Sequence, residues 1–211
     1  QSLREGLMNS CNPVFMGLAM KVGKEKYYSY LNALKVSQKT GIDLPGEANG
    51  IIHSIQNVSG STIASASFGQ GFTLTQLNML SVISTIANKG IMMKPRIVKE
   101  IKNAKGEVVQ AIEPVMVKQV FSESTSNAVL DMMESVVSDG TGRYAQVKGY
   151  YIAGKTSTAE QGDKTNPIYV ASFIAISPIE NTQVIVLVTI NGLAESVNHQ
   201  GGQVAGDRAA L

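Results

Sequence analysis

The first 22 positions show a helical pattern of apolar residues that is broken once. Apolar side chains recur four or seven residues apart, as one face of a helix requires, at Leu3, Leu7, Val14, Leu18 and Val22. Asn12-Pro13 interrupts the pattern, because proline disfavours helix in the residue before it and suits the first position of a new helix. We therefore predict a short helix, a bend at Ser10 and Cys11, and a second helix capped by Asn12.

Two later stretches have helical features, with a hairpin pattern between them. Leu74 to Asn88 predicts a helix that ends at Gly90, and Ser124 to Ser138 predicts one that ends before "DGTG". Between them, "RIVKEIKNAKGEVVQAI" alternates apolar and polar residues around a Lys105-Gly106 turn. This alternation predicts a β-hairpin.

The last third of the chain has the pattern of successive strands. "YYIAGKTST", "YVASFIAIS" and "TQVIVLVTI" are spaced as antiparallel strands, and the last two are joined through Pro178 and Asn181. The sequence has no internal repeat and no low-complexity linker. We expect an α/β chain of the α+β kind, in which helices accompany an antiparallel sheet.

Composition narrows the functional classes. The 211 residues suffice for one large domain or part of one. Eighteen Lys and Arg against sixteen Asp and Glu, without a basic run, give no indication of nucleic-acid binding. The single cysteine, Cys11, excludes an internal disulfide. With only His53 and His199 besides, no metal-ligand cluster of recognisable spacing can form, and we expect neither metal nor cofactor. No apolar run reaches the roughly 18 residues that span a bilayer.

The stretch "GYYIAGKTSTAE", Gly149 to Glu160, begins with a match to the phosphate-binding pattern G-x-x-x-x-G-K-[ST]. A phosphate loop needs turn-forming residues between its glycines and a helix that starts at the Lys-Thr pair. Here the interior residues prefer a strand, and Gly162, Asn166 and Pro167 leave no room for a helix afterwards. We therefore expect a strand that does not bind nucleotide.

On such a strand, Lys155 and Ser157 would lie on one face and Thr156 and Thr158 on the other. A lysine beside a cleft could orient a carboxylate or polarise a hydroxyl group. A lysine on a solvated face would have no specific role, and most lysines are of this kind. The strand alone does not decide between the two interpretations.

The bend "SCN" offers a second candidate. Ser10 and Asn12 are two residues apart, which in a turn or an extended segment directs both side chains to one side. A hydroxyl and an amide that converge there could relay a proton and bind a substrate carbonyl. Alternatively, Asn12 is only a helix cap and Ser10 only a turn residue.

Together these motifs resemble the penicillin-binding proteins, specifically the class B D,D-transpeptidases, including their sporulation-type members. That family carries the signatures S-x-x-K, S-x-N and K-T-G, of which "SCN" resembles the second and "KTS" the third. Longer stretches occur in the family's order and approximate spacing: "TGIDLPGEANG", "ASFGQGFTLTQLNML", "IANKGIMMKPRIV", "DGTGRYAQVKGYYIAGKTSTAE" and "GGQVAG". The resemblance covers nearly the whole chain.

The resemblance implies a β-lactamase/transpeptidase-like fold with a helical subdomain and an antiparallel sheet. It implies serine acyl transfer, in which a serine attacks the D-Ala-D-Ala carbonyl of a peptidoglycan stem peptide and an amine resolves the acyl-enzyme. β-Lactams mimic the donor and trap that intermediate, so stem peptides and β-lactams are the implied partners. The full-length protein would act on the extracytoplasmic face of the bacterial cell membrane.

The resemblance also assigns roles to residues. Ser10 would belong to the proton-relay network, Asn12 would bind the donor's amide oxygen, and Lys155 would support the network electrostatically. The hydroxyl of Thr156 would meet the substrate or antibiotic carboxylate, and the backbone N–H of Thr158 would donate to the oxyanion. The stretch "FGQG", residues 68–71, is expected to be a structural turn near the cleft.

Three departures from the family pattern affect this prediction. No S-x-x-K precedes "SCN", so the nucleophile would lie upstream of Gln1 and the 211-residue chain alone would be inactive. Ser157 stands where the family has glycine, and its side chain could crowd the cleft or tilt the strand. "TQLN" replaces the usual T-P-L-Q around Thr75, and after Gly206 the chain reads "DRAAL" in place of the family's final helix.

We therefore expect a partial transpeptidase domain, incomplete at both ends. Residues 1–90 would be mainly helical and carry the S-x-N motif, and residues 91–211 would form a hairpin, a helix and the strand with the K-T-G-like motif. Lost sheet strands would leave an unpaired edge that favours self-association. The alternative is a non-catalytic module of the same fold that binds peptides or assists cell-wall assembly.

Overall fold

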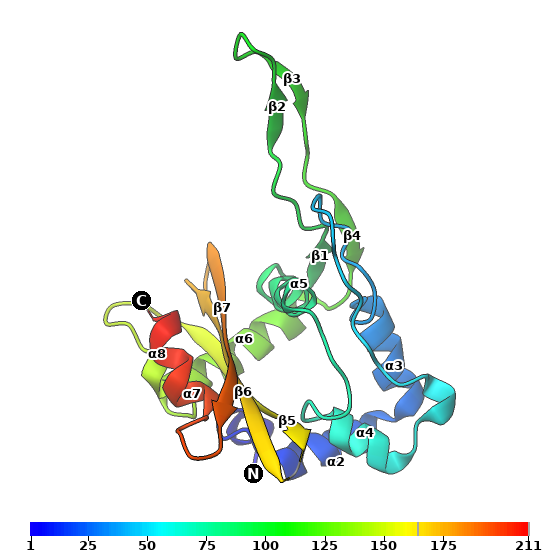
Figure 1. The fold of residues 1–211 in the computed structure, drawn as a ribbon, viewed down its shortest axis with the longest axis vertical. Helices are drawn as coiled ribbons and strands as arrows, with labels where there is room; N and C mark the ends of the chain where they lie inside the picture. Colours follow the sequence, from blue (N-terminus) through cyan, green and yellow to red (C-terminus); the bar gives the residue numbers. More distant parts are fainter. Residues whose placement is uncertain (164, 211) are drawn as a thin grey trace.

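The computed structural model describes residues 1–163 and 165–210 (Figure 1). The helices are α1 (Leu3–Met8), α2 (Asn12–Val22), α3 (Lys24–Ala33), α4 (Gly60–Ala66), α5 (Gln76–Ala87), α6 (Glu123–Ser138), α7 (Gly201–Val204) and α8 (Gly206–Ala209), with 3-10 turns at Ile55–Asn57 and Arg143–Ala145. The strands are β1 (Ile91–Met93), β2 (Glu100–Lys102), β3 (Val108–Ala111), β4 (Met116–Gln119), β5 (Ala153–Asp163), β6 (Asn166–Ser177) and β7 (Val184–Ala194). The expected combination of helices and antiparallel strands is confirmed.

The break between the first two helices is confirmed, but its predicted cap is wrong. After α1 the chain turns at Ser10, whose φ of 54° lies in the left-handed region. The N–H of Cys11 donates to the carbonyl of Gly6, which closes the helix in a Schellman motif. Cys11 is consequently the extended N-cap residue of α2, and Asn12 is already helical. The side chain of Asn12 is therefore not used as a cap.

The two later helices begin and end close to the predicted residues. Thr75 caps α5 by accepting a hydrogen bond from the N–H of Asn78, and Ser122 caps α6 by accepting one from Thr125. α5 ends at a left-handed turn that includes Gly90, as predicted. The patterns did not predict α3, α4 or the short ribbon in which β1 pairs with β4.

The predicted hairpin is the β2–β3 ribbon. Its strands pair antiparallel, with Glu100 opposite Ala111 and Ile101 opposite Gln110. Figure 1 shows this ribbon projecting away from the rest of the molecule, beyond the β1–β4 pair. It therefore lies apart from the three-stranded sheet.

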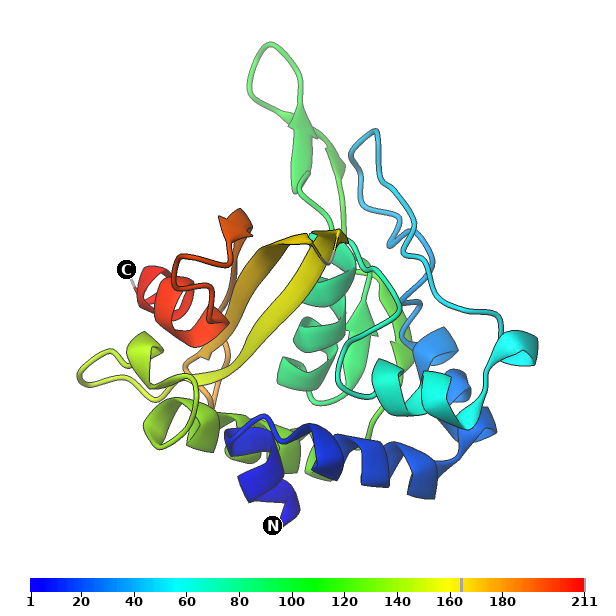
Figure 2. The same ribbon diagram turned by 60° about the horizontal axis from the view of Figure 1, so that its bottom comes forward.

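The last three predicted strands form one antiparallel sheet in the order β5-β6-β7. Successive residues of β6 face opposite sides. Phe173 is fully buried against Ala205 of the C-terminal segment, whereas Ile176 is fully buried against Met133 of α6. In Figure 2 the helices α7 and α8 (red) lie against one side of the sheet and α6 (green) against the other. Two helical layers thus hold the sheet and fix the position of β5.

The outer strands of this sheet are β5 and β7. Within the described residues, the outer edge of β7 pairs with no other strand. None of the helices in the described part of the chain is long and apolar enough to cross a membrane.

Candidate functional site

A cleft of about 760 Å³ borders the outer edge of β5. Five chain segments line it: the bend between α1 and α2, the turn at 67–70, the loop at 140–144, the start of β5 and the segment at 199–203. All the residues that the sequence singled out contribute to this lining: Ser10, Asn12, Lys155, Thr156, Ser157 and Thr158. The fold therefore brings the "SCN" and "KTS" motifs to one place.

A hydrogen bond across the cleft joins the two motifs. The ammonium group of Lys155 donates to the hydroxyl oxygen of Ser10 at 2.8 Å, although the residues are 145 positions apart. Ser10 can meet Lys155 because its left-handed backbone turns the chain sharply between the two helices. That conformation costs a non-glycine residue about 1 kcal/mol or more, and such strain persists where the surrounding structure holds it.

Lys155 is a cation in a partly buried position. Burial lowers the pKa of its ammonium group from the ordinary 10.5 to about 8. Besides Ser10, it donates to the backbone carbonyl of Thr156 at 2.9 Å, and no carboxylate in the described part of the chain forms an ion pair with it. The interpretation of Lys155 as a solvated surface residue is wrong, and the cleft holds a positive charge that an anion could neutralise.

Thr156 presents its hydroxyl beside that charge. Its Oγ1 lies 3.4 Å from the Nζ of Lys155 and 3.2 Å from the Oγ1 of Thr141. Thr141 is tied in turn to α1, because its N–H donates to the carbonyl of Met8 at 3.2 Å. The loop at 140–144 thus connects the end of α1 with β5. Thr141 lies in the "DGTG" stretch but belongs to neither of the two predicted site motifs.

The start of α7 packs closely on β5. The N–H of Gly201 donates to the Oγ1 of Thr158 at 3.1 Å. A Cβ atom at Gly201 would collide with the carbonyl oxygen of Ser157, and one at Gly202 would collide with that of Thr141. Glycines are therefore required where this segment closes one side of the cleft.

Ser157 occupies a regular strand. It pairs opposite Ser172, and the register between β5 and β6 runs without a shift from Ala153 to Asp163. The strand is not bulged at the position where the family has glycine. The side chain of Ser157 is exposed and lines the cleft, where it adds bulk beside Thr156 and Thr158.

The phosphate-loop interpretation of Lys155 is wrong in this fold. Lys155 and Thr156 lie inside β5, opposite Ile174 and Phe173 of β6. No helix begins at them, so backbone N–H groups do not converge there as a phosphate loop requires.

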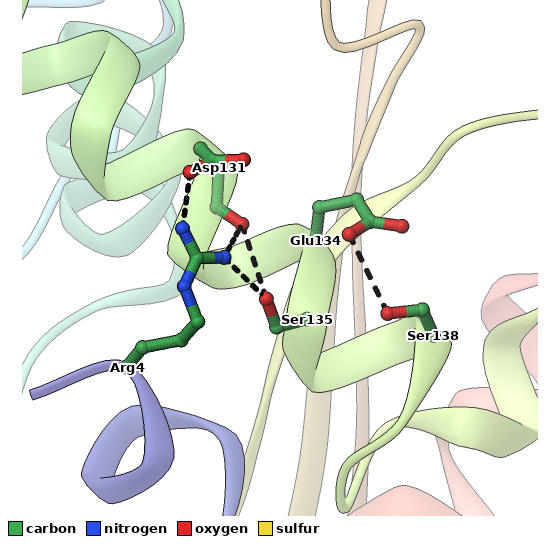
Figure 3. A network of polar contacts seen from close by, with 5 residues as sticks. All are labelled: Arg4, Asp131, Glu134, Ser135 and Ser138. Atoms are coloured by element: carbon green, nitrogen blue, oxygen red, sulfur yellow. Dashed lines mark hydrogen bonds and ion pairs between the residues drawn. The ribbon is translucent and has the colours of Figure 1, made fainter. Parts of the chain in front are cut away.

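A polar network away from the cleft holds α1 in place (Figure 3). The Nη1 atom of Arg4 donates to the carbonyl of Asp131 at 3.1 Å and to the hydroxyl of Ser135 at 2.6 Å, and its other nitrogen pairs with the Asp131 carboxylate. On the same helix, Ser138 donates to Glu134 at 3.4 Å. Arg4 thereby anchors α1, and with it the bend at Ser10, to α6.

Several cleft residues were not predicted from the sequence: Phe15, Ser67, Arg143, His199 and Gln203. His199 stacks on Tyr169 with ring centroids 3.9 Å apart, at the end of the cleft next to α7. The "FGQG" turn is confirmed, with Gly69 and Gly71 at positive φ. Among the described residues, no group of three His, Cys, Asp or Glu side chains could hold a metal ion.

Known proteins share both the sequence and this geometry. Residues 1–210 match the family model "Penicillin binding protein transpeptidase domain". The chain is 37% identical to stage V sporulation protein D of Bacillus subtilis over 209 residues, which is 97% of this chain and 32% of that protein. It is 33% identical to penicillin-binding protein PbpB of Mycobacterium tuberculosis, covering 93% of this chain and 30% of that one.

Solved structures agree with these sequence matches. Penicillin-binding protein 3 from Mycobacterium tuberculosis, complexed with aztreonam, superposes with a TM-score of 0.89 at 30% identity, over 99% of this chain and 49% of that one. The complex of the same protein with ampicillin superposes with a TM-score of 0.84 at 32% identity, over 90% of this chain and 45% of that one. The chain spans about a third of the curated relatives named above. The match to the family model over almost the whole chain shows that this chain belongs to the penicillin-binding protein transpeptidase family.

Proposed function

We propose that this chain supplies two walls of a peptidoglycan D,D-transpeptidase site that acts by serine acyl transfer on D-Ala-D-Ala stem peptides. The observation that carries this proposal is the bond between Lys155 and Ser10 across the cleft. The cleft beside this bond is lined by the cation of Lys155, the hydroxyl groups of Ser10 and Thr156, and the amide of Asn12. A peptide with a terminal carboxylate requires such a set of polar groups.

The geometry supports a distinct role for each residue. Ser10, held by Lys155, would relay a proton between the nucleophile and the leaving group, because a hydroxyl both donates and accepts. Asn12 is free of capping and would bind the donor's amide oxygen. Lys155 and Thr156 would receive the carboxylate, since a charge-assisted hydrogen bond is about twice as strong as a neutral one. The N–H of Thr158 would donate to the oxyanion.

The nucleophile would come from an S-x-x-K segment, which the sequence does not contain ahead of "SCN". Acyl transfer requires an activated nucleophile, so the 211-residue chain alone should bind donor analogues without forming an acyl-enzyme. In the complete domain, residues 1–90 would form the mainly helical part with the S-x-N motif, and residues 91–211 the part with the K-T-G-like strand.

A binding experiment tests this proposal. Acetylated Lys-D-Ala-D-Ala and benzylpenicillin are titrated into the isotopically labelled chain, and backbone amide shifts are followed by NMR. We expect shifts confined to the cleft, around Asn12, Thr156 and Thr158, and no mass increase. Thr156→Val should weaken binding, whereas Thr189→Val, which lies on β7 and contacts Ser172, should not. A covalent penicillin adduct, or shifts away from the cleft, would contradict the proposal.

Two further expectations, on self-association and on cellular location, depend on this proposal. Self-association would use the outer edge of β7, whose backbone groups have no partner strand within the described residues. The complete protein would work on the extracytoplasmic face of the bacterial membrane, where peptidoglycan lies. Fractionation of the native protein, with protease added outside spheroplasts, tests the second expectation: protection from the protease would contradict it.

A further inference from the structure

A second region, distinct from the cleft, has the features of an interaction surface. We define the arm as residues 94–115, which contain β2 and β3 and form the projection in Figure 1. None of its residues is buried. Its exposed large apolar side chains are all β-branched and are 37% to 66% accessible: Ile97, Val98, Ile101, Val108, Val109 and Val115. Six exposed apolar side chains on one short projecting segment exceed the scattered single residues of an ordinary surface, and they make the arm a candidate for contact with a partner.

The arm is held in place at its base. The carboxylate of Asp43 accepts hydrogen bonds from the N–H groups of Ile97 and Val98, both at 2.8 Å. The N–H of Lys94 donates to the carbonyl of Val115 at 2.9 Å, which closes the base. The arm is therefore presented in a defined direction, and a partner would not have to order it first.

Both outer edges of the arm are open. β2 and β3 form a two-stranded sheet, so in the described part of the chain each strand pairs on one side only. A two-stranded ribbon is marginally stable in water, and a third strand would satisfy one row of unpaired N–H and C=O groups. β-Branched side chains are those that pack well against a neighbouring strand.

The charge of the arm specifies the partner further. The arm carries five Lys or Arg and three Glu, which leaves thirteen residues of each sign in the rest of the chain. The net charge of +2 therefore resides in the arm. Arms of two copies would repel each other. The arm also has no aromatic residue and no Leu, which are the side chains that insert at a lipid interface.

We propose that the arm is a docking surface for an acidic, apolar β-strand of another protein, which adds to the outer edge of β2 or β3. Strand addition would supply the backbone hydrogen bonds, the exposed valines and isoleucines would contact alternate side chains of the added strand, and the arm's lysines would pair with its carboxylates.

The test uses the full 211-residue chain and a labelled ten-residue peptide that alternates valine with glutamate, followed by fluorescence anisotropy at low salt. A peptide with lysine in place of glutamate and one with two central prolines are the comparisons. We expect the acidic peptide to bind and both comparison peptides to fail. K99E with K105E should weaken binding about tenfold, because two attractive charge pairs become repulsive.

Matched variants separate a specific surface from general charge. K26E with K148E changes the net charge equally on other exposed surfaces and should leave binding unchanged. I101T with V109T removes apolar contact but keeps β-branched side chains, and should also weaken binding while thermal unfolding stays the same.

Three outcomes would overturn the proposal. The first is equal binding of the acidic and basic peptides. The second is tighter binding to vesicles with anionic headgroups than to the peptide. The third is no binding at all, which would show that the lysines only protect an open strand edge from pairing.

Discussion

The two outer strands of the sheet, β5 and β7, differ in what lies along their outer edges. β5 borders a cleft because residues from distant segments reach its edge: Ser10 from the first bend, Thr141 from the loop after α6, and Gly201 from the end of the chain. Within the described residues no strand pairs with the outer edge of β7, and Val184 and Val186 are exposed on it. We propose that an edge strand becomes a binding site where tertiary contacts bring polar groups to it, and that an edge without such contacts stays open to association.

Among changes at these two strands, we expect the largest effect when the cation on β5, Lys155, is removed. Lys155→Met keeps the length of the side chain but removes the charge, with which no carboxylate of the described residues forms an ion pair. We expect the noncovalent affinity for benzylpenicillin to fall by about 100-fold, as loss of a charge-assisted hydrogen bond predicts. NMR titration gives the dissociation constant, and Lys148→Met, outside the cleft, is the matched control. Equal affinities of the two variants for benzylpenicillin would show that Lys155 does not contribute to binding.

The second largest effect is expected from disrupting the close contact between α7 and β5. In Gly201→Ala the new methyl group would meet the carbonyl of Ser157, so α7 must move away from the strand. We expect a loss of about 1–3 kcal/mol in the free energy of unfolding, measured by urea denaturation.

The control for this change is Gly17→Ala in α2, where a methyl group would meet nothing within 4 Å. There we expect a gain of about 0.5–1 kcal/mol, because alanine favours a helix interior. A similar loss at both positions would show that the cleft wall is not tightly packed.

Lys155 makes the β5 side sensitive to pH. Its pKa is about 8, so the cation is lost above that pH, and binding of a carboxylate ligand should fall about tenfold between pH 8 and 9.5. Between about pH 8 and the ordinary 10.5 the unfolded chain binds the proton that the folded chain has released, so this group makes stability rise with pH there. A pH titration of the affinity checks the first effect, and a flat profile in Lys155→Met is its control.

The open β7 edge should respond to added charge. Val184→Lys with Val186→Lys places two like charges on the strand, and we expect dimer formation to weaken several-fold, since lysines on an edge oppose strand pairing. Analytical ultracentrifugation measures the association, with Val22→Lys on α2 as the control for an added cation. If the wild-type chain is monomeric at high concentration, the edge is not an association site.

The smallest effect is expected at Ser157, within β5. Because the strand is already regular there, Ser157→Gly changes only the bulk beside Thr156 and Thr158. We expect penicillin affinity to rise by about threefold or less, since removing one small exposed side chain changes a contact by under 1 kcal/mol. Ser196→Gly, outside the cleft, is the control, and a large increase would mean that Ser157 blocks the ligand.

The strand and helix patterns determined most of the local structure. Alternation placed β5, β6 and β7, the Lys105-Gly106 turn placed the hairpin, and apolar spacing placed α5 and α6, because each depends on neighbouring residues. The local pattern does not indicate β1 and β4, because these strands are only three and four residues long and pair with each other across the intervening chain. It also misplaced the cap of α2, because the left-handed turn at Ser10 shifts the helix start by one residue.

The sequence by itself determined which residue types the site contains and, through its family motifs, where to look for them. Only the tertiary structure decided that Lys155 is partly buried, that it reaches Ser10, and that Thr141 and the Gly201-Gly202 pair complete the walls. The physical reason is that these contacts join positions up to 145 residues apart. Their geometry depends on how α6, α7 and α8 pack against the sheet, which no local pattern specifies.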